Sequence, residues 1–297
     1  MGPDARSYQG IQTMNRLTSL FCLSFMVYAP LSAANDLTPA FEAVEARDFV
    51  QAIETLERLA DDNATRDTLF HLALNQYRRA EFTDARGTLK QLNKRYPGDA
   101  DAHYLAGLVY LALIGEVNVF RKVGMAKKTM RSWETALDID AGHLNSRFAI
   151  LAFYAQAPAI AGGDIEKATE MQMEIAELSE EYGTLALAML KSKQEDDAAA
   201  EAAFQHAFTL TDRAGPHFSF AQYHLRREQW EQAIEESNEY LNRERRWWDP
   251  DVTLAYLIKA RAHSELGNTR QAREIANQGL SLNPNRQIRE MLEETLQ

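Results

Sequence analysis

One alanine recurs along this chain at an interval close to 33 residues, and this period constrains the fold more than any other feature of the sequence. The recurring alanines are Ala52, Ala85, Ala168, Ala200, Ala233 and Ala272, and Thr129 holds the equivalent place in one further unit. The intervals from Ala52 to Ala85 and from Ala200 to Ala233 are both 33 residues. A recurring period of about this length is typical of stacked repeats, each of which buries its apolar face against its neighbours.

Each unit is predicted to be a pair of helices. In the clearest unit, residues 66–97, the apolar positions of the second helix are Ala85, Leu89 and Leu92, which is the spacing of a buried helical face. Residues 253–284 form a second clear unit, and residues 287–296 predict a more polar final helix, as the end of a solenoid requires. Because no segment alternates like a strand, we predict one all-α domain over residues 35–297 with about seven helical hairpins.

The pattern within each unit resembles the tetratricopeptide repeat. It has a small residue in the first helix, the alanine in the second, an apolar residue four positions later and often proline at the end. The resemblance implies a right-handed superhelical solenoid whose concave groove holds peptides or other partners, and it does not imply catalysis. The pairing of FRKVGMAKK with APAIAGGDIEKA further resembles a subgroup of secreted bacterial tetratricopeptide proteins.

The N-terminal segment is typical of a secretory signal peptide. From Met14 it has a cationic start at Arg16, an apolar run over residues 17–29 and small residues at 32–34 that fit a cleavage site. We therefore predict a signal peptide over residues 1–34, with translation starting at Met14, and a periplasmic or secreted mature protein without a membrane span. An uncleaved N-terminal anchor is the alternative. The only cysteine, Cys22, would leave with the signal peptide.

Composition and motifs narrow the classes of function. A formal net charge of −11 argues against nucleic-acid binding, because phosphates repel such a surface. None of the seven histidines stands in an H-E-x-x-H arrangement, and the sequence has no phosphate-binding glycine loop and no nucleophile elbow. We predict no catalytic residues, no metal site and no cofactor.

Two neighbouring units carry extra residues. The intervals from Ala85 to Thr129 and from Thr129 to Ala168 are 44 and 39 residues, which predicts extended turns within the hairpins near 114–128 and 155–164. Turns within consecutive hairpins emerge on the same edge of a solenoid, so we expect these two to meet. The edge residues predicted to bind a partner or an anion are Phe120, Lys122, Lys127, Lys128, Gly162 and Gly163. The alternative is a structural turn beside a solvated row of lysines.

The concave groove of the resembled family is lined by positions of the first helices. Carried over to this chain, the predicted groove residues are Phe70, Leu74, Tyr77, Arg78, Tyr104, Phe148, Phe218, Gln222, Arg226 and Arg261. This mixture of aromatic side chains and arginines suits a peptide with apolar anchors. The alternative is that several of the aromatic rings only pack between helices. Trp247 and Trp248 are adjacent, which predicts either an exposed anchor or packing under the next hairpin.

The sequence therefore favours a non-enzymatic interaction scaffold of the bacterial periplasm or cell envelope that binds a peptide or protein partner. Two alternatives stay open at this stage. The first is a small-ligand-binding accessory protein of solute transport that uses the basic, glycine-containing edge, and the second is a structural subunit of an envelope assembly.

Overall fold

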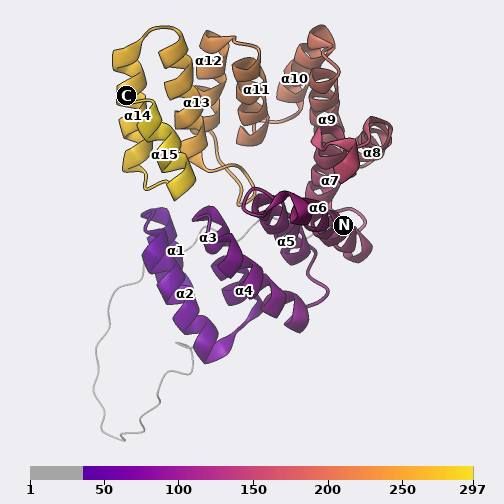
Figure 1. Ribbon diagram of the computed structural model, residues 1–297, viewed down its shortest axis with the longest axis vertical. Helices are drawn as coiled ribbons and strands as arrows, with labels where there is room; N and C mark the ends of the chain where they lie inside the picture. The colour runs from indigo at the N-terminus through magenta and orange to yellow at the C-terminus, as the bar shows by residue number, and fades with distance from the viewer. Residues whose placement is uncertain (1–35, 297) are drawn as a thin grey trace, which may run out of the picture. The chain divides into compact units, whose positions relative to one another are not determined.

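A computed structural model describes residues 36–296, so the predicted signal peptide lies outside the described residues. All regular structure in the described part of the chain is helical, with fifteen α-helices and one short 3-10 helix (Figure 1). The helices α1 to α14 pair in chain order as seven antiparallel hairpins, and α15 packs against the last of them. The predicted all-α solenoid of about seven hairpins is confirmed.

The helices of the seven hairpins have the following bounds. They are α1 (Thr38–Glu45) and α2 (Phe49–Asn63), α3 (Arg66–Arg78) and α4 (Phe82–Arg95), α5 (Ala100–Leu113) and α6 (Val119–Ile139), α7 (Leu144–Gln156) and α8 (Ile165–Leu178), α9 (Glu180–Lys193) and α10 (Asp197–Leu210), α11 (Ala214–Arg226) and α12 (Trp230–Leu241), α13 (Val252–Glu265) and α14 (Thr269–Ser281). The 3-10 helix η2 (Ala159–Ala161) lies between α7 and α8, and α15 (Arg286–Glu294) ends the fold.

The recurring alanines lie where helices approach most closely. Ala52, Ala85, Ala168, Ala200 and Ala233 are fully buried, and Ala272 is 1% exposed. A small side chain at this position lets the second helix of a hairpin contact the first, and the larger apolar residues around it fill the space between layers. The period found in the sequence is therefore the period of helix packing.

Short polar side chains begin many of the helices. Asp99 accepts a hydrogen bond from the backbone N–H of Ala102 at 3.0 Å, and Thr65 accepts one from Thr68 at 3.2 Å. Such caps satisfy backbone donors that have no partner within the helix. Between the two helices, six of the seven hairpins turn through a residue of positive φ, and the exception is the third.

The third and fourth hairpins are the units in which the sequence carries extra residues. In the third hairpin only residues 114–118 form the turn, and Val119 to Lys128 are the first turns of a 21-residue α6. The predicted extended turn over 114–128 is thus wrong for residues 119–128, because Asn118 caps a helix there by accepting a hydrogen bond from the Arg121 N–H at 3.3 Å. The fourth hairpin does have a long connection, which contains η2, and α6 packs against η2. The predicted meeting of the two stretches is confirmed.

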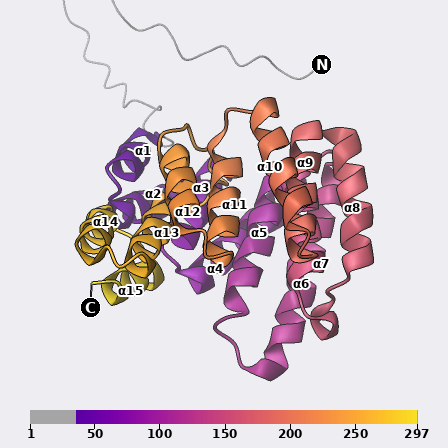
Figure 2. The ribbon, with the colours of Figure 1, turned by 90° about the horizontal axis from the view of Figure 1, so that it is seen from above.

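The first and last hairpins lie side by side (Figures 1 and 2). The Arg47 guanidinium pairs with both carboxylate oxygens of Asp251, at 3.0 and 3.1 Å, and also donates to the carbonyl of Leu282. In return, the Asn283 side chain donates to the carbonyl of Arg47 at 2.9 Å. This clasp joins the turn after α1 to the segments that precede α13 and follow α14.

Candidate functional site

The connection between α12 and α13, residues 242–251, crosses the inner side of the stack of hairpins. Trp247 lies edge-on to Phe70 of α3, with ring centroids 5.2 Å apart, and to Tyr104 of α5, at 6.0 Å. Its carbonyl accepts a hydrogen bond from Arg78 at 3.3 Å. Trp247 therefore packs against the second and third hairpins, so the prediction that it packs under the next hairpin is wrong.

This connection covers the first part of the predicted groove. Phe70 and Leu74 are each 4% exposed, and Tyr77 packs against the same apolar cluster as Trp247. Burial raises the pKa of the Tyr77 hydroxyl and lowers the pKa of the Arg78 guanidinium. Phe70 and Arg78 thus contact the chain's own segment, and Leu74 and Tyr77 belong to the apolar cluster that this segment packs against. This agrees with the alternative that several of the aromatic rings only have a packing role.

An open pocket remains beside the crossing segment. Its volume is about 890 Å³, and it is lined by residues of α5, α6, α7, η2, α9 and α11 together with Trp248, Asp249 and Pro250. Three predicted groove residues, Tyr104, Phe148 and Phe218, contribute to its walls. We call this space the inner pocket.

The walls of the inner pocket are mainly apolar and aromatic. Trp133 and Phe153 pack edge to face with centroids 6.3 Å apart, and Phe148 packs in the same way against Tyr182 at 6.3 Å. Trp133 is 1% exposed and its indole N–H donates to the carbonyl of Tyr104 at 3.1 Å, so its polar atom is satisfied within the wall. Rigid aromatic walls of this kind suit an apolar side chain or an apolar small molecule.

A few polar groups interrupt the apolar lining. The Tyr182 hydroxyl donates to Asn145 at 3.3 Å and accepts from Arg213 at 3.2 Å, while Arg213 also pairs with Glu181. Burial and the nearby Arg246 lower the pKa of the Arg213 guanidinium. Burial raises the pKa of Asp249, against the opposing effects of the Arg246 backbone N–H and nearby arginines. The contacts among Asn145, Tyr182 and Arg213 hold these side chains in place in one wall of the pocket, where they can orient a bound ligand.

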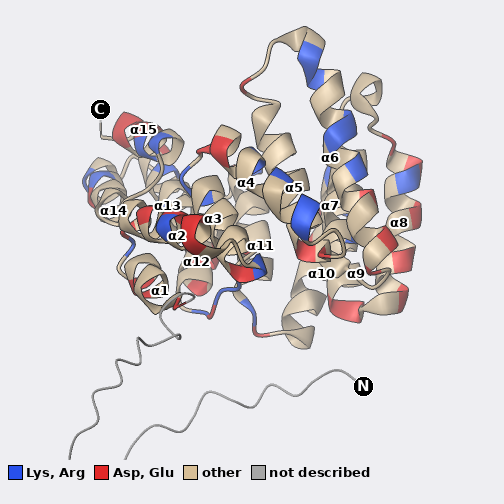
Figure 3. Ribbon diagram, turned by 90° about the horizontal axis from the view of Figure 1, so that it is seen from below, with Lys and Arg blue, Asp and Glu red and all other residues tan. Residues whose placement is uncertain are grey.

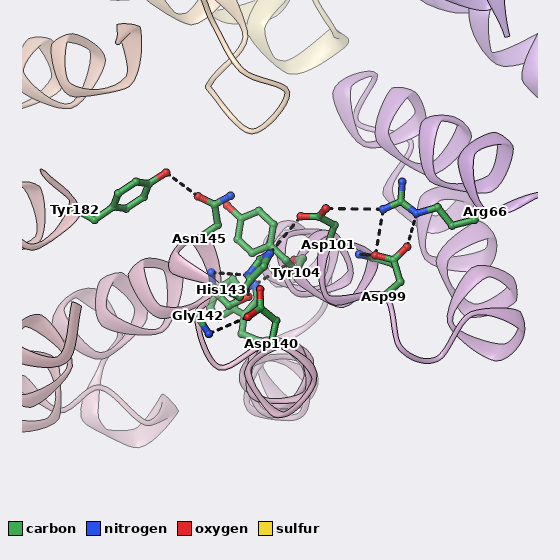
Figure 4. Close-up of polar contacts among 12 residues, drawn as sticks. Arg66, Asp99, Asp101, Tyr104, Asp140, Gly142, His143, Asn145 and Tyr182 are labelled. Carbon is green, nitrogen blue, oxygen red and sulfur yellow. Dashed lines mark hydrogen bonds and ion pairs between the residues drawn. The ribbon is translucent and has the colours of Figure 1, made fainter. Parts of the chain in front are cut away.

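A row of polar contacts holds the starts of the first helices in register (Figure 4). Arg66 pairs with Asp99 at 2.6 Å and approaches Asp101 at 3.8 Å, and Asp101 in turn lies 3.2 Å from the His143 ring. The Asn145 and Tyr182 contact continues the row from α7 to α9. The row connects four successive hairpins, and its last two residues, Asn145 and Tyr182, line the inner pocket.

The mouth of the inner pocket carries exposed apolar side chains. Val119, Lys122 and Val123 of α6 and Ile160 of η2 line it, and Val119 and Ile160 are 68% and 85% exposed. Phe120 lies beside them and is 92% exposed. Exposed apolar groups around a cavity are typical of interaction sites. No sequence pattern marks Ile160, whereas the two glycines of its loop form a recognisable turn signal.

The two glycines have a structural role. Gly162 has a φ of +105°, and a Cβ on Gly163 would lie 1.7 Å from the Ala157 carbonyl oxygen. Their N–H groups donate to the carbonyls of Ala159 and Pro158, and the Asp164 N–H donates to Tyr154. These amides are used within the turn, so they offer no free donors to an anion, whereas partner binding at Phe120 and Lys122 stays a prediction.

The other predicted site residues lie elsewhere. Gln222, Arg226 and Arg261 are exposed and do not line the inner pocket, and Lys127 and Lys128 are exposed on α6. Within residues 36–296, no group of three or more His, Cys, Asp or Glu side chains is placed to hold a metal ion. None of the helices described is long and apolar enough to cross a membrane.

Comparison with known proteins supports the repeat assignment. A tetratricopeptide repeat family model matches residues 67–99, and no curated protein matches the chain. A tetratricopeptide repeat protein from Parabacteroides merdae aligns with a TM-score of 0.54 and 15% identity over 88% of this chain and 97% of that one. A thermophilic tetratricopeptide repeat protein from Thermus thermophilus aligns with a TM-score of 0.52 and 16% identity over 69% of this chain and 97% of that one.

Human IFIT1, solved as a dimer with m7Gppp-AAAA, gives a TM-score of 0.52 and 16% identity over 84% of this chain and 55% of its own. Identities this low show a common fold alone.

Proposed function

We propose that this chain, a member of the tetratricopeptide repeat superfamily, is a non-enzymatic scaffold that binds a polypeptide partner through its inner pocket. The observation that carries the proposal is the pocket of about 890 Å³ with aromatic walls and an exposed apolar mouth. Binding energy at protein interfaces is concentrated where a few large apolar side chains enter a desolvated pocket. A partner with one or two apolar anchors would meet that condition here.

The crossing segment limits where such a partner would bind. Because Trp247 covers Phe70 and contacts Tyr104, a peptide does not have the whole inner face available. The free part lies between α5 and α11, next to the apolar mouth formed by α6 and η2. We expect a short anchor segment to bind there rather than a long peptide along all seven hairpins.

We further propose that the protein acts in the periplasm or cell envelope. Support comes from the sequence of residues 14–34, with its cationic start, short apolar run and small residues before Asn35. N-terminal sequencing of the protein from an envelope fraction tests this, with Asn35 as the expected first residue. An intact residue 1–34 segment on protein from the cytoplasm would contradict it.

Site-specific photo-crosslinking tests the inner pocket. A photoreactive phenylalanine analogue is placed at Phe148, which lines the pocket, and at Gln222, which is exposed and does not. In the native envelope we expect a discrete adduct from position 148 only. Ala152→Trp should abolish it, because Ala152 lines the pocket and a large ring there fills it. Equal adducts from both positions, or an adduct that persists in Ala152→Trp, would contradict the proposal.

A small apolar ligand is a second candidate occupant. The volume of the inner pocket falls within the range of roughly 300–1,000 Å³ typical of small-molecule sites, and Arg213 and Tyr182 would orient a polar group of the ligand. A thermal-shift screen with fatty acids and aromatic carboxylates tests this, since a ligand that binds only the folded state raises the melting temperature. The expected rise should be absent in Ala152→Trp, and no rise with any ligand would rule this candidate out.

A further inference from the structure

A second groove lies on the other side of α6, between α4, α5 and α6. Six of its lining residues are basic: Arg86, Lys90 and Lys94 from α4, His103 from α5, and Lys128 and Arg131 from α6. Its volume is about 430 Å³. Figure 3 shows basic residues along α6, whereas α8 carries mainly acidic ones. We call this space the basic groove.

The basic groove concentrates positive charge in an acidic protein. The chain has a formal net charge of −11, yet no carboxylate is among the residues that line the groove. The acidic residues on the same helices, Asp84, Asp101, Glu134 and Asp138, do not line it. A cluster of basic side chains with no carboxylate among them creates a positive local potential, which attracts anionic groups.

The arginines and lysines of the basic groove have no carboxylate partner among residues 36–296. Some cations elsewhere in the described chain do have such partners, as Arg66 has Asp99 and Arg147 has Glu174. Lys128 instead lies over the ring of Tyr110, with its ammonium 5.7 Å from the centroid. The charges of the groove are therefore available to a ligand.

The shape of the groove favours an extended polypeptide. Arg86, Lys90 and Lys94 follow one another at four-residue intervals, which places them on one stripe with an axial rise of about 6 Å between them. In an extended peptide every second side chain points to the same side, about 6.6 Å apart. The floor of the groove is apolar, with Leu89, Val109 and Tyr110, and it suits the aliphatic part of glutamate side chains.

We propose that the basic groove binds an acidic polypeptide segment in extended conformation, with carboxylates at alternate positions facing the stripe on α4. This surface is separate from the inner pocket, since α6 lies between them: Lys122, Ala126 and Trp133 line the pocket, whereas Lys128 and Arg131 line the groove. The groove is thus a second contact surface, and its ligand does not depend on what the inner pocket holds.

Fluorescence anisotropy with defined peptides tests this inference on the mature chain. The probe is a fluorescein-labelled peptide of alternating glutamate and serine, about six residues long so that it spans roughly 20 Å. The reference peptide carries glutamine in place of glutamate. We expect the acidic peptide to bind at least about tenfold more tightly, and raised salt to weaken its binding because the contacts are exposed.

Charge-reversal variants locate the binding. The double variant Lys90→Glu, Arg131→Glu should weaken the acidic peptide about tenfold or more, which corresponds to about 1.4 kcal/mol. The matched control is Arg270→Glu, Arg273→Glu, which makes the same change of net charge on exposed positions of α14 outside the groove. This control should leave the affinity within about twofold, because charges beyond the screening length contribute little.

Three outcomes would overturn the inference. They are equal binding of the glutamate and glutamine peptides, equal loss in the groove and control variants, and binding of inorganic tripolyphosphate at this groove without binding of the acidic peptide. The last outcome would assign the groove to a phosphate ligand instead. Because Ala152→Trp fills only the inner pocket, it should leave peptide binding unchanged, which separates this test from that of the proposed function.

Discussion

Removal of the Trp247 side chain tests whether the crossing segment holds distant hairpins together. The ring packs edge-on against Phe70, Tyr104 and Trp248 at centroid distances of 5.2, 6.0 and 5.5 Å. Each aromatic pair contributes about 0.5–1.5 kcal/mol beyond its buried area. Truncation of a fully buried tryptophan costs about 3–5 kcal/mol, and Trp247 is only partly buried. We therefore expect Trp247→Ala to lower the free energy of unfolding by about 3 kcal/mol.

Calorimetry of the chain gives the measurement. A loss of this size should lower the melting temperature by roughly 6–12 °C, since 1 kcal/mol corresponds to about 2–4 °C in chains of similar length. Glu244→Ala, an exposed position in the same segment, is the control and should change stability by less than about 0.5 kcal/mol. A double-mutant cycle with Phe70→Leu should give a coupling of about 1 kcal/mol. Additive effects of Phe70→Leu and Trp247→Ala would refute the contact.

Three further changes address packing, the clasp and pH. Gly107→Ala should destabilise the chain by about 1–3 kcal/mol, because the added Cβ would lie 2.1 Å from Trp133 Nε1. Gly124→Ala adds a Cβ that has no atom within 4 Å, so in the same thermal assay it should stabilise α6 by about 0.5–1 kcal/mol. Arg47→Ala removes the contacts to Asp251 and Leu282, so amide hydrogen exchange should accelerate in α1 and α13–α15 while α8–α10 stay unchanged. Burial raises the pKa of Asp249 above its ordinary 3.8, so ionisation of this carboxylate destabilises the folded state as the pH rises. Asp249→Asn should therefore raise the melting temperature more at pH 7 than near pH 3.5. An equal rise at both pH values would contradict the pKa shift.

The regular part of this fold was predictable because it is encoded locally. Each hairpin contacts mainly its neighbours in the stack, so the position of a buried alanine such as Ala85 recurs with the period of the packing. The number of hairpins, the more polar last helix and the meeting of the two longer units all follow from that period. The turn at 114–118 was harder to predict, since a capped extension of α6 and a long loop have the same length in the sequence.

The candidate sites depended on contacts that no local pattern encodes. Phe70 and Tyr104 occupy the expected inner face, but the segment that meets them there comes from residue 247, and the clasp joins Arg47 to Asp251. Such pairs form only after the curvature of several hairpins has brought distant segments together. The sequence by itself determined the repeat, its helices and the small residues between them. Only the tertiary structure decided which part of the inner face is covered, which part is an open pocket, and which lysines and arginines share one groove.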